Sequence, residues 1–246
     1  MLIDIIVLFF SVFLTGLIFL SKPLKQRINL RSFLIFGGSY LFSLTIIHLL
    51  PEVFHHDSEG ISLGYFVLLG FFIQLALEHF SGGIEHGHVH IRKSSSAFSS
   101  RSVFLLISLS IHAFLEGTLL AHPKIFEHEH NSKALLIGIV LHKIPAAIAL
   151  CSVLMSLMQS RSRIILYITI FAVASPIGLL LSDYLIVADI LSGELFLILF
   201  AIVSGNFLHI STTIFFETDP EHNLSVQKLV ISIFGAMIAV LAEFVL

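Results

Sequence analysis

The chain has 246 residues, of which 57% are hydrophobic and only 12% are charged, and its mean hydropathy is +1.01. An ordinary soluble domain needs far more charge on its surface, so that class of protein is excluded. The formal net charge of −3 is small, and the distribution of the charges is more informative than their sum. A single cysteine, Cys151, excludes disulfides and thiolate metal clusters within one chain.

Long apolar runs dominate the sequence, and a helix needs about 20 such residues to cross a bilayer. The runs are continuous and do not alternate with polar residues, which favours helices over lipid-spanning strands. We therefore predict an all-α polytopic membrane protein with one transmembrane domain, 1–246. The first run has no basic segment before it, so we expect a span and not a removed signal peptide. The eight expected spans are 2–20, 31–54, 62–80, 102–122, 134–157, 163–183, 193–216 and 225–246.

The basic residues of the loops predict the orientation of these spans. Ten Lys and Arg residues fall in the loops after spans one, three, five and seven, whereas the opposite loops hold only Lys124 and Lys133. The first set of loops is therefore expected in the cytoplasm and both termini outside. The localisation that follows is a cell membrane, the inner one in a Gram-negative bacterium.

The ends of spans two and seven are weakly similar to each other. Span two ends in HLLPEVFHH, and span seven ends in FFETDPEH. In the predicted topology these two ends lie on opposite sides of the membrane. The similarity is compatible with an inverted repeat of spans 1–3 and 6–8 around spans 4–5, a frequent plan in transporters.

Spans four and five carry ionisable residues in the middle of apolar sequence. His112 and Glu116 are four residues apart and lie on one face of a helix, and His142 can face them from span five. Intramembrane ionisable groups are costly and indicate function by default. Imidazole and carboxylate groups suit zinc or a similar divalent ion. The structural alternatives are a buried His–Glu hydrogen bond between helices and a hydrogen bond from His142 to a carbonyl group.

Two residues near these groups have a geometric role in the prediction. Pro145 removes a helical hydrogen bond, so we expect a kink that leaves the Leu141 carbonyl group free for water or an ion. Gly117 should allow another helix or a ligand to approach closely.

These motifs together resemble those of the ZIP (Zrt/Irt-like) divalent-metal transporters. The fourth helix of that family carries a His-x-x-x-Glu/Asp-Gly pattern, which His112-Ala-Phe-Leu-Glu116-Gly117 matches. The fifth helix often reads His-Lys-Ile-Pro-Glu-Gly, and His142-Lys143-Ile144-Pro145 matches its first four positions. The resemblance extends to the eight spans, the His-rich loop after span three and the segment 175–178 in span six. It implies a transporter in which the helices that bear the site move against a static scaffold.

The chain departs from the family pattern at residues that would ligate metal. Ala146 replaces the glutamate of the fifth helix, and Ala113 stands where two-metal members often have a polar ligand. Lys143 and Ser175 occupy other positions where two-metal members place acids. The resemblance to single-site members therefore implies one ion, with the ammonium group of Lys143 in the place of a second.

The expected function is transport of a divalent cation, zinc as the first candidate, into the cytoplasm through a site of His112, Glu116 and His142. Lys143 and Ser175 are expected to modulate that site. We expect no enzymatic activity and no cofactor, because the metal is cargo, and no Walker motif indicates ATP-driven pumping. The expected partners are the cation, the lipid bilayer and, as an open alternative, a second copy of the chain in a homodimer, without nucleic acid.

Two other functions remain open from the sequence. An intramembrane zinc hydrolase would also place His and acid ligands in the bilayer, but it needs an open metal position and a general base, and HExxH is absent. The replacement of the family glutamate by Ala146 motivates the other alternative, a transport-deficient protein that senses or buffers metal.

A second set of residues is expected to gather metal at the entrance or exit. Near the end of span two, His48 and Glu52 are four residues apart and share a helix face. In span seven, His209 and Glu217 are eight residues apart, about two turns, and roughly share a face. The alternate histidines after span three share one side of an extended loop. An acid in span three could replace the missing glutamate. These residues are His48, Glu52, Glu78, His86, His88, His90, His209 and Glu217.

Overall fold

The structure is a computed structural model that contains α-helices and one π-helical turn, with no strand in the part of the chain that it describes. The described residues are 1–21, 30–55, 62–81, 98–121, 132–217 and 225–245. The elements are α1 (Leu2–Ser21), α2 (Leu30–Leu44), the π-turn η1 (Thr45–Leu49), α3 (Leu50–His55), α4 (Leu63–Ser81), α5 (Phe98–Thr118), α6 (Ser132–Leu157), α7 (Arg161–Val187), α8 (Gly193–Glu217) and α9 (Val226–Val245).

The all-helical prediction is confirmed, and each expected span coincides with a helix. Elements α2, η1 and α3 follow one another without a break and form span two. Seven of the described helices are long and apolar enough to cross a membrane by length and composition. The helix of span four is the exception, because its apolar part, Ser102–Thr118, is shorter.

Span four ends four residues before the predicted boundary. The chain leaves α5 at Thr118 through two turns, in which the N–H groups of Leu120 and Ala121 donate to the carbonyl oxygens of Gly117 and Thr118. Residues Leu119 to Ala121 continue the apolar run because they are buried in the protein core, not because they cross lipid.

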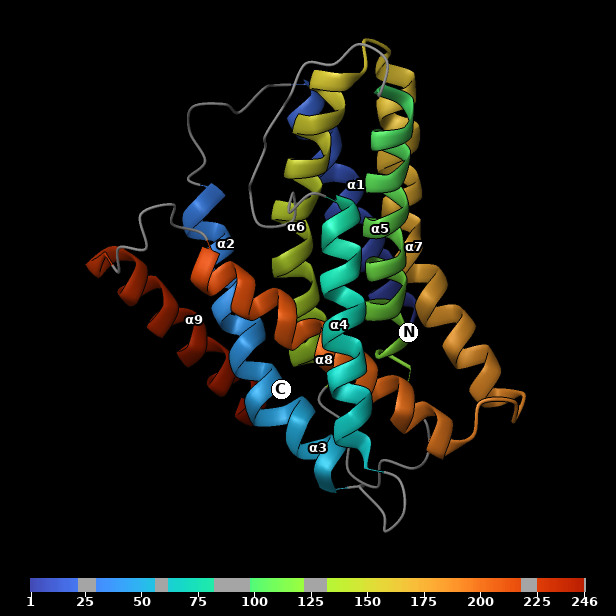
Figure 1. Cartoon of the computed structure of the whole chain (residues 1–246), viewed down its shortest axis with the longest axis vertical. Helices are drawn as coiled ribbons and strands as arrows, with labels where there is room; N and C mark the ends of the chain where they lie inside the picture. The colour runs from blue at the N-terminus through green and yellow to red at the C-terminus, as the bar shows by residue number, and fades with distance from the viewer. Residues whose placement is uncertain (22–29, 56–61, 82–97, 122–131, 218–224, 246) are drawn as a thin grey trace.

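The helices form two groups (Figure 1). Helices α1, α5, α6 and α7, which we call the site bundle, share a hydrophobic core, and α1, α5 and α6 each contact α7. The other helices form the flanking bundle, in which α4 packs on α8 and α2 packs on both α8 and α9. Contacts of α2 with α6 and of α4 with α5 join the two bundles.

Helices α5 and α7 pack with almost no space between their backbones. A Cβ atom added at Gly117 would lie 2.1 Å from the carbonyl oxygen of Ser175, and one added at Gly178 would lie 2.1 Å from that of Phe114. Only glycine fits at such distances, as is common where membrane helices cross closely. The expectation that Gly117 admits a neighbouring helix is therefore confirmed.

The pattern of helix contacts agrees with the inverted repeat, which remains a prediction. A two-fold relation of spans 1–3 to spans 6–8, and of span four to span five, would exchange the α2–α9 contact with the α8–α4 contact. It would likewise exchange α5–α7 with α6–α1, and both of these contacts are present.

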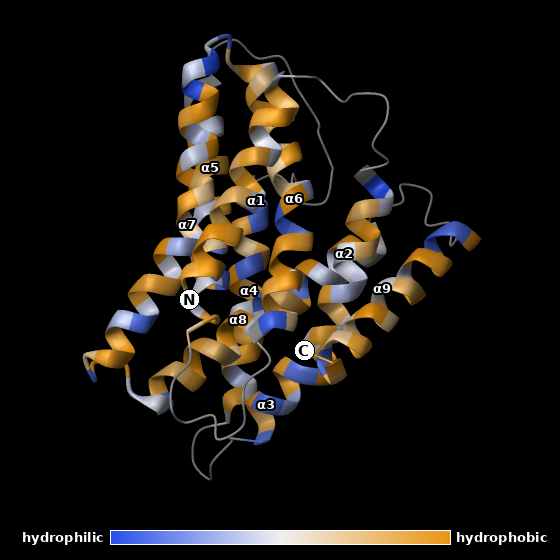
Figure 2. Cartoon of the chain, turned by 180° about the vertical axis from the view of Figure 1, so that it is seen from behind, coloured by the Kyte–Doolittle hydropathy of each residue, from blue (hydrophilic) through white to orange (hydrophobic). Residues whose placement is uncertain are grey.

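The surface is suited to lipid. Hydrophobic residues run along most of the length of the helices, and hydrophilic residues gather at several helix ends, including α3 (Figure 2). Large exposed apolar side chains extend along α1 and α9, for example Phe10, Leu14, Ile233 and Phe234. A helical membrane protein presents such surfaces to acyl chains, which fits the polytopic class.

Candidate metal centre

Three of the predicted ligands meet where α5 and α6 lie side by side. His112 and Glu116 are one turn apart on α5, and His112 Nε2 lies 2.9 Å from Glu116 Oε1. His142, on α6, places its ring centroid 5.6 Å from that of His112, at an interplanar angle of 87°. All three side chains are buried.

The potential ligand atoms of these side chains are almost close enough together to bind one ion. One potential ligand atom from each residue can be chosen so that all lie within 4.8 Å of one another. Zinc with ligands at about 2.0–2.1 Å in a tetrahedron needs them roughly 3.4 Å apart. Small side-chain rotations would therefore bring the three atoms to coordination distance. Within the described residues no other group of three His, Cys, Asp or Glu is this compact.

A lysine shares the carboxylate of this cluster. The Nζ atom of Lys143 lies 2.9 Å from Glu116 Oε2, so each Glu116 oxygen faces a different partner. Lys143 also donates a hydrogen bond to Ser175 Oγ, which donates to the Ala113 carbonyl oxygen at 2.5 Å. The ring of Phe171 lies beneath the ammonium group, with its centroid 5.5 Å away. Hydrogen bonds and an ion pair therefore hold a fixed cation beside the ligand cluster.

Ala146, which replaces the glutamate of the family pattern, brings no carboxylate to this cluster. It is buried on α6, one turn after His142, in the core of the site bundle. The proposed substitute, Glu78, does not join the cluster, because its carboxylate pairs with His209 across the α4–α8 contact at 3.5 Å. Among the described residues the compact group therefore offers three ligand side chains, one of them a carboxylate.

The kink expected at Pro145 stays a prediction. Helix α6 continues through Pro145. The Leu141 carbonyl oxygen lies against α2, where a Cβ atom added at Gly37 would come within 3.1 Å of it. The carbonyl group thus contributes to packing between the two bundles.

Two pairs outside the cluster involve residues that were expected at the entrance or exit, namely His48 in one pair and both Glu78 and His209 in the other. His48 Nδ1 lies 2.7 Å from Glu243 Oε1, which joins η1 to α9. Glu52 follows on α3 and is partly buried. The imidazole of His209, which pairs with Glu78, also contacts the edge of Phe71, with ring centroids 4.7 Å apart. Neither pair is part of the compact ligand group.

Some candidate residues lie outside the part of the chain that the structure describes. They are His86, His88 and His90 of the loop after span three, and the side chain of Glu217 at the end of α8. For these residues the expected role at the exit stays a prediction.

Sequence reasoning missed two residues that contact the candidate residues: Glu243, which pairs with His48, and Phe171, which lies against Lys143. Glu243 lies in the apolar run of span eight, and the rule that intramembrane acids indicate function would have selected it. Phe171 carries no such signal, because phenylalanine occurs throughout the spans and its position under Lys143 depends on how α6 and α7 pack.

Comparison with known proteins identifies the family. The family model described as ZIP Zinc transporter matches residues 84–243, which include α5 to α8 and most of α9. Zinc transporter ZIP9 of Micropogonias undulatus is 28% identical over 122 residues, which are 50% of this chain and 39% of that protein. Zinc transporter ZIP1 of Danio rerio is 31% identical over 136 residues, or 53% of this chain and 41% of that protein.

Zinc transporter ZIP9 of Xenopus tropicalis is 27% identical over 124 residues, or 50% of this chain and 40% of that protein. The matched part of the chain thus spans about 40% of the length of these relatives. The family model covers more than half of the chain and includes every residue of the ligand cluster. The chain is therefore a multi-pass membrane protein that belongs to the ZIP zinc transporter family.

Proposed function

We propose that this chain carries a divalent metal cation, with zinc as the first candidate, from outside into the cytoplasm. The observation that supports this most directly is the buried cluster of His112, Glu116 and His142 on adjacent helices of a ZIP family member. The relatives named above are called zinc transporters, which makes zinc the first ion to test.

The charge of the cluster favours passage over storage. A zinc ion and Lys143 bring three positive charges, and Glu116 brings one negative charge. Such an excess in a buried site weakens binding. An ion that is held too tightly cannot leave, so weak binding is useful to a carrier.

The two bundles provide a means of exposing the site to each side in turn. The site bundle holds all three ligands, and the flanking bundle contacts it through α2 and α4. We propose that the site bundle moves against the flanking bundle during transport, as the family resemblance implies. We also propose that residues 1–83 belong to the same domain as the matched region, because α1 packs on α6 and α7 and α2 packs on α8 and α9.

A flux assay with purified protein in proteoliposomes tests the transport proposal. Zinc influx is expected for the wild type, and His112→Ala and Glu116→Ala should each abolish it while the protein remains in the membrane. His79→Ala is the matched control, because His79 is exposed on α4 and lies outside the cluster. Full influx in both cluster variants would contradict the site assignment.

The hydrolase alternative has less support from the cluster. A metallohydrolase needs a carboxylate or similar base beside an open metal position. Glu116 is the only carboxylate in the compact group found among the described residues, and both of its oxygens already face basic partners. A hydrolase would also move no metal in the flux assay.

The sensor or buffer alternative is tested by restoring the family glutamate. Its prediction is a wild type without flux and an Ala146→Glu variant that transports zinc. Our proposal predicts flux in the wild type, so the same pair of proteins separates the two.

A further inference from the structure

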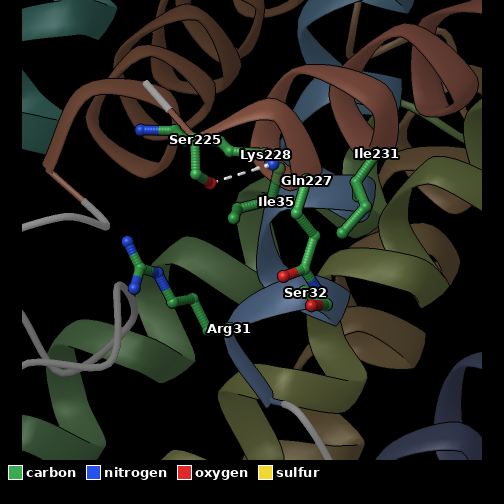
Figure 3. A pocket seen from close by; sticks show the side chains of 7 residues that line it. All are labelled: Arg31, Ser32, Ile35, Ser225, Gln227, Lys228 and Ile231. Carbon is green, nitrogen blue, oxygen red and sulfur yellow. Dashed lines mark hydrogen bonds between the residues drawn. The ribbon is translucent and has the colours of Figure 1, made fainter. Parts of the chain in front are cut away.

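A basic cavity lies between the first turns of α2 and α9, away from the metal centre. Its volume is about 180 Å³. This is smaller than the roughly 300–1,000 Å³ of pockets that hold drug-sized ligands, so it suits a compact group. Figure 3 shows the lining side chains, which are Arg31, Ser32, Ile35, Ser225, Gln227, Lys228 and Ile231.

The lining is suited to an anion with several oxygen atoms. It contains a guanidinium group, an ammonium group, two hydroxyl groups and an amide, and none of the seven lining residues is acidic. The guanidinium fork of Arg31 can bind a phosphate through two parallel hydrogen bonds. Lys228 is only 5% exposed, so its charge is held within the protein and not in open solvent.

The backbone adds to the same preference. Helices α2 and α9 both begin beside the cavity, at Leu30 and Val226, and helix N-termini favour negative charge. The N–H group of Lys228 donates to Ser225 Oγ at 3.2 Å, which fixes the first turn of α9 (Figure 3).

The surroundings point to a lipid. On α9, the residues next to the cavity include Val226, Leu229 and Val230, whose side chains are exposed. An anion in the cavity would thus have an apolar strip beside it along α9, on a helix that can span the bilayer. Basic pockets at the cytoplasmic ends of membrane helices recognise anionic headgroups in this way. Arg31 and Lys228 lie at the ends of spans two and eight that are predicted to face the cytoplasm.

We propose that this cavity binds the phosphate-bearing headgroup of an anionic phospholipid, with the acyl chains along α9. Arg31 and Lys228 contact the phosphate, and the hydroxyl groups of Ser32 and Ser225 accept or donate hydrogen bonds around it. The proposal does not depend on metal transport, because the metal ligands lie on α5 and α6.

Native mass spectrometry of the full chain in detergent tests this, with phosphatidylglycerol as the anionic probe and phosphatidylcholine as the zwitterionic one. The wild type should retain phosphatidylglycerol preferentially. Arg31→Gln and Lys228→Gln should each weaken retention about fivefold, as expected when one basic contact to an anionic headgroup is lost. Lys228→Arg should keep it.

The matched controls are Arg161→Gln and Arg163→Gln. These residues are exposed in the first turn of α7 and do not line the cavity. Arg31 is exposed, so its variant keeps the test valid if Lys228→Gln does not fold. Equal losses in the control variants, or unchanged retention in both cavity variants, would overturn the proposal. Displacement of phosphatidylglycerol by millimolar inorganic phosphate would overturn it in favour of a free phosphate ligand.

Discussion

The ion pair between Glu116 and Lys143 allows the structural and ligand roles of Glu116 to be separated. Both side chains are almost completely buried, with exposures of 0% and 2%, and their charged atoms are 2.9 Å apart. Glu116→Gln keeps the shape but leaves the ammonium group of Lys143 without a counter-charge. The loss of one partner of a buried pair costs about 3–5 kcal/mol. For a chain of this size that corresponds to a fall in Tm of roughly 10 °C.

The double variant Glu116→Gln, Lys143→Met removes both charges and should recover most of that stability, because an apolar side chain can replace a buried ion. Thermal unfolding in detergent measures the four corners of this cycle and gives the coupling energy. Glu194→Gln is the control, since it makes the same chemical change at an exposed position in the first turn of α8.

Transport gives the second readout. The double variant should remain inactive in zinc influx although it is stable, because a metal ligand has been lost. Influx at the wild-type rate in this variant would refute the role of Glu116 as a ligand. An unchanged Tm in the single variant would refute the importance of the ion pair.

Three further predictions follow from the helix contacts and the ligand shell. Gly117→Ala should destabilise the protein by about 3 kcal/mol, because the added methyl group would collide with the Ser175 carbonyl oxygen on α7. Gly64→Ala is the control and should leave the Tm unchanged, because a Cβ atom there would make only ordinary van der Waals contacts. Ala146→Glu should tighten zinc binding about tenfold or more in calorimetry by adding a carboxylate beside His142, and an unchanged Kd would place residue 146 outside the shell. Tyr40→Phe removes the buried hydrogen bond from the Tyr40 hydroxyl group to the Ala134 carbonyl oxygen. It should lower the free energy of unfolding by about 1 kcal/mol in the same assay. An unchanged free energy would show that this link between the bundles is energetically neutral.

The spans and the cluster could be predicted for different reasons. Hydropathy locates a membrane helix because lipid demands an apolar surface along its whole length, so residues 31–54 were predicted close to the observed helical run. Hydropathy placed the end of span four beyond the end of α5, because Leu119 is apolar but packs inside the protein and does not face lipid. The spacing of His112 and Glu116 sufficed to place both on one face. The position of His142 beside them was predicted because it is an ionisable residue within the next apolar span, and the family resemblance supported it.

Pairs between distant helices could not be read from spacing. His48 and Glu243 are 195 residues apart, and no periodicity within either helix encodes how far one slides along the other. The same holds for Glu78 and His209. Helix faces are local properties of a sequence, whereas the register between helices is set by packing over the whole bundle.

The Lys143–Glu116 pair also bears on how the membrane potential acts on this protein. With both groups ionised their charges cancel, so a site bundle that returns without metal carries no net charge from this pair across the field. A bundle loaded with a divalent ion carries two additional charges, each worth about 2.3 kcal/mol per 100 mV. We therefore expect an inside-negative potential to speed the inward step and to leave the return step unchanged. Zinc influx that does not respond to an imposed inside-negative membrane potential would contradict that expectation.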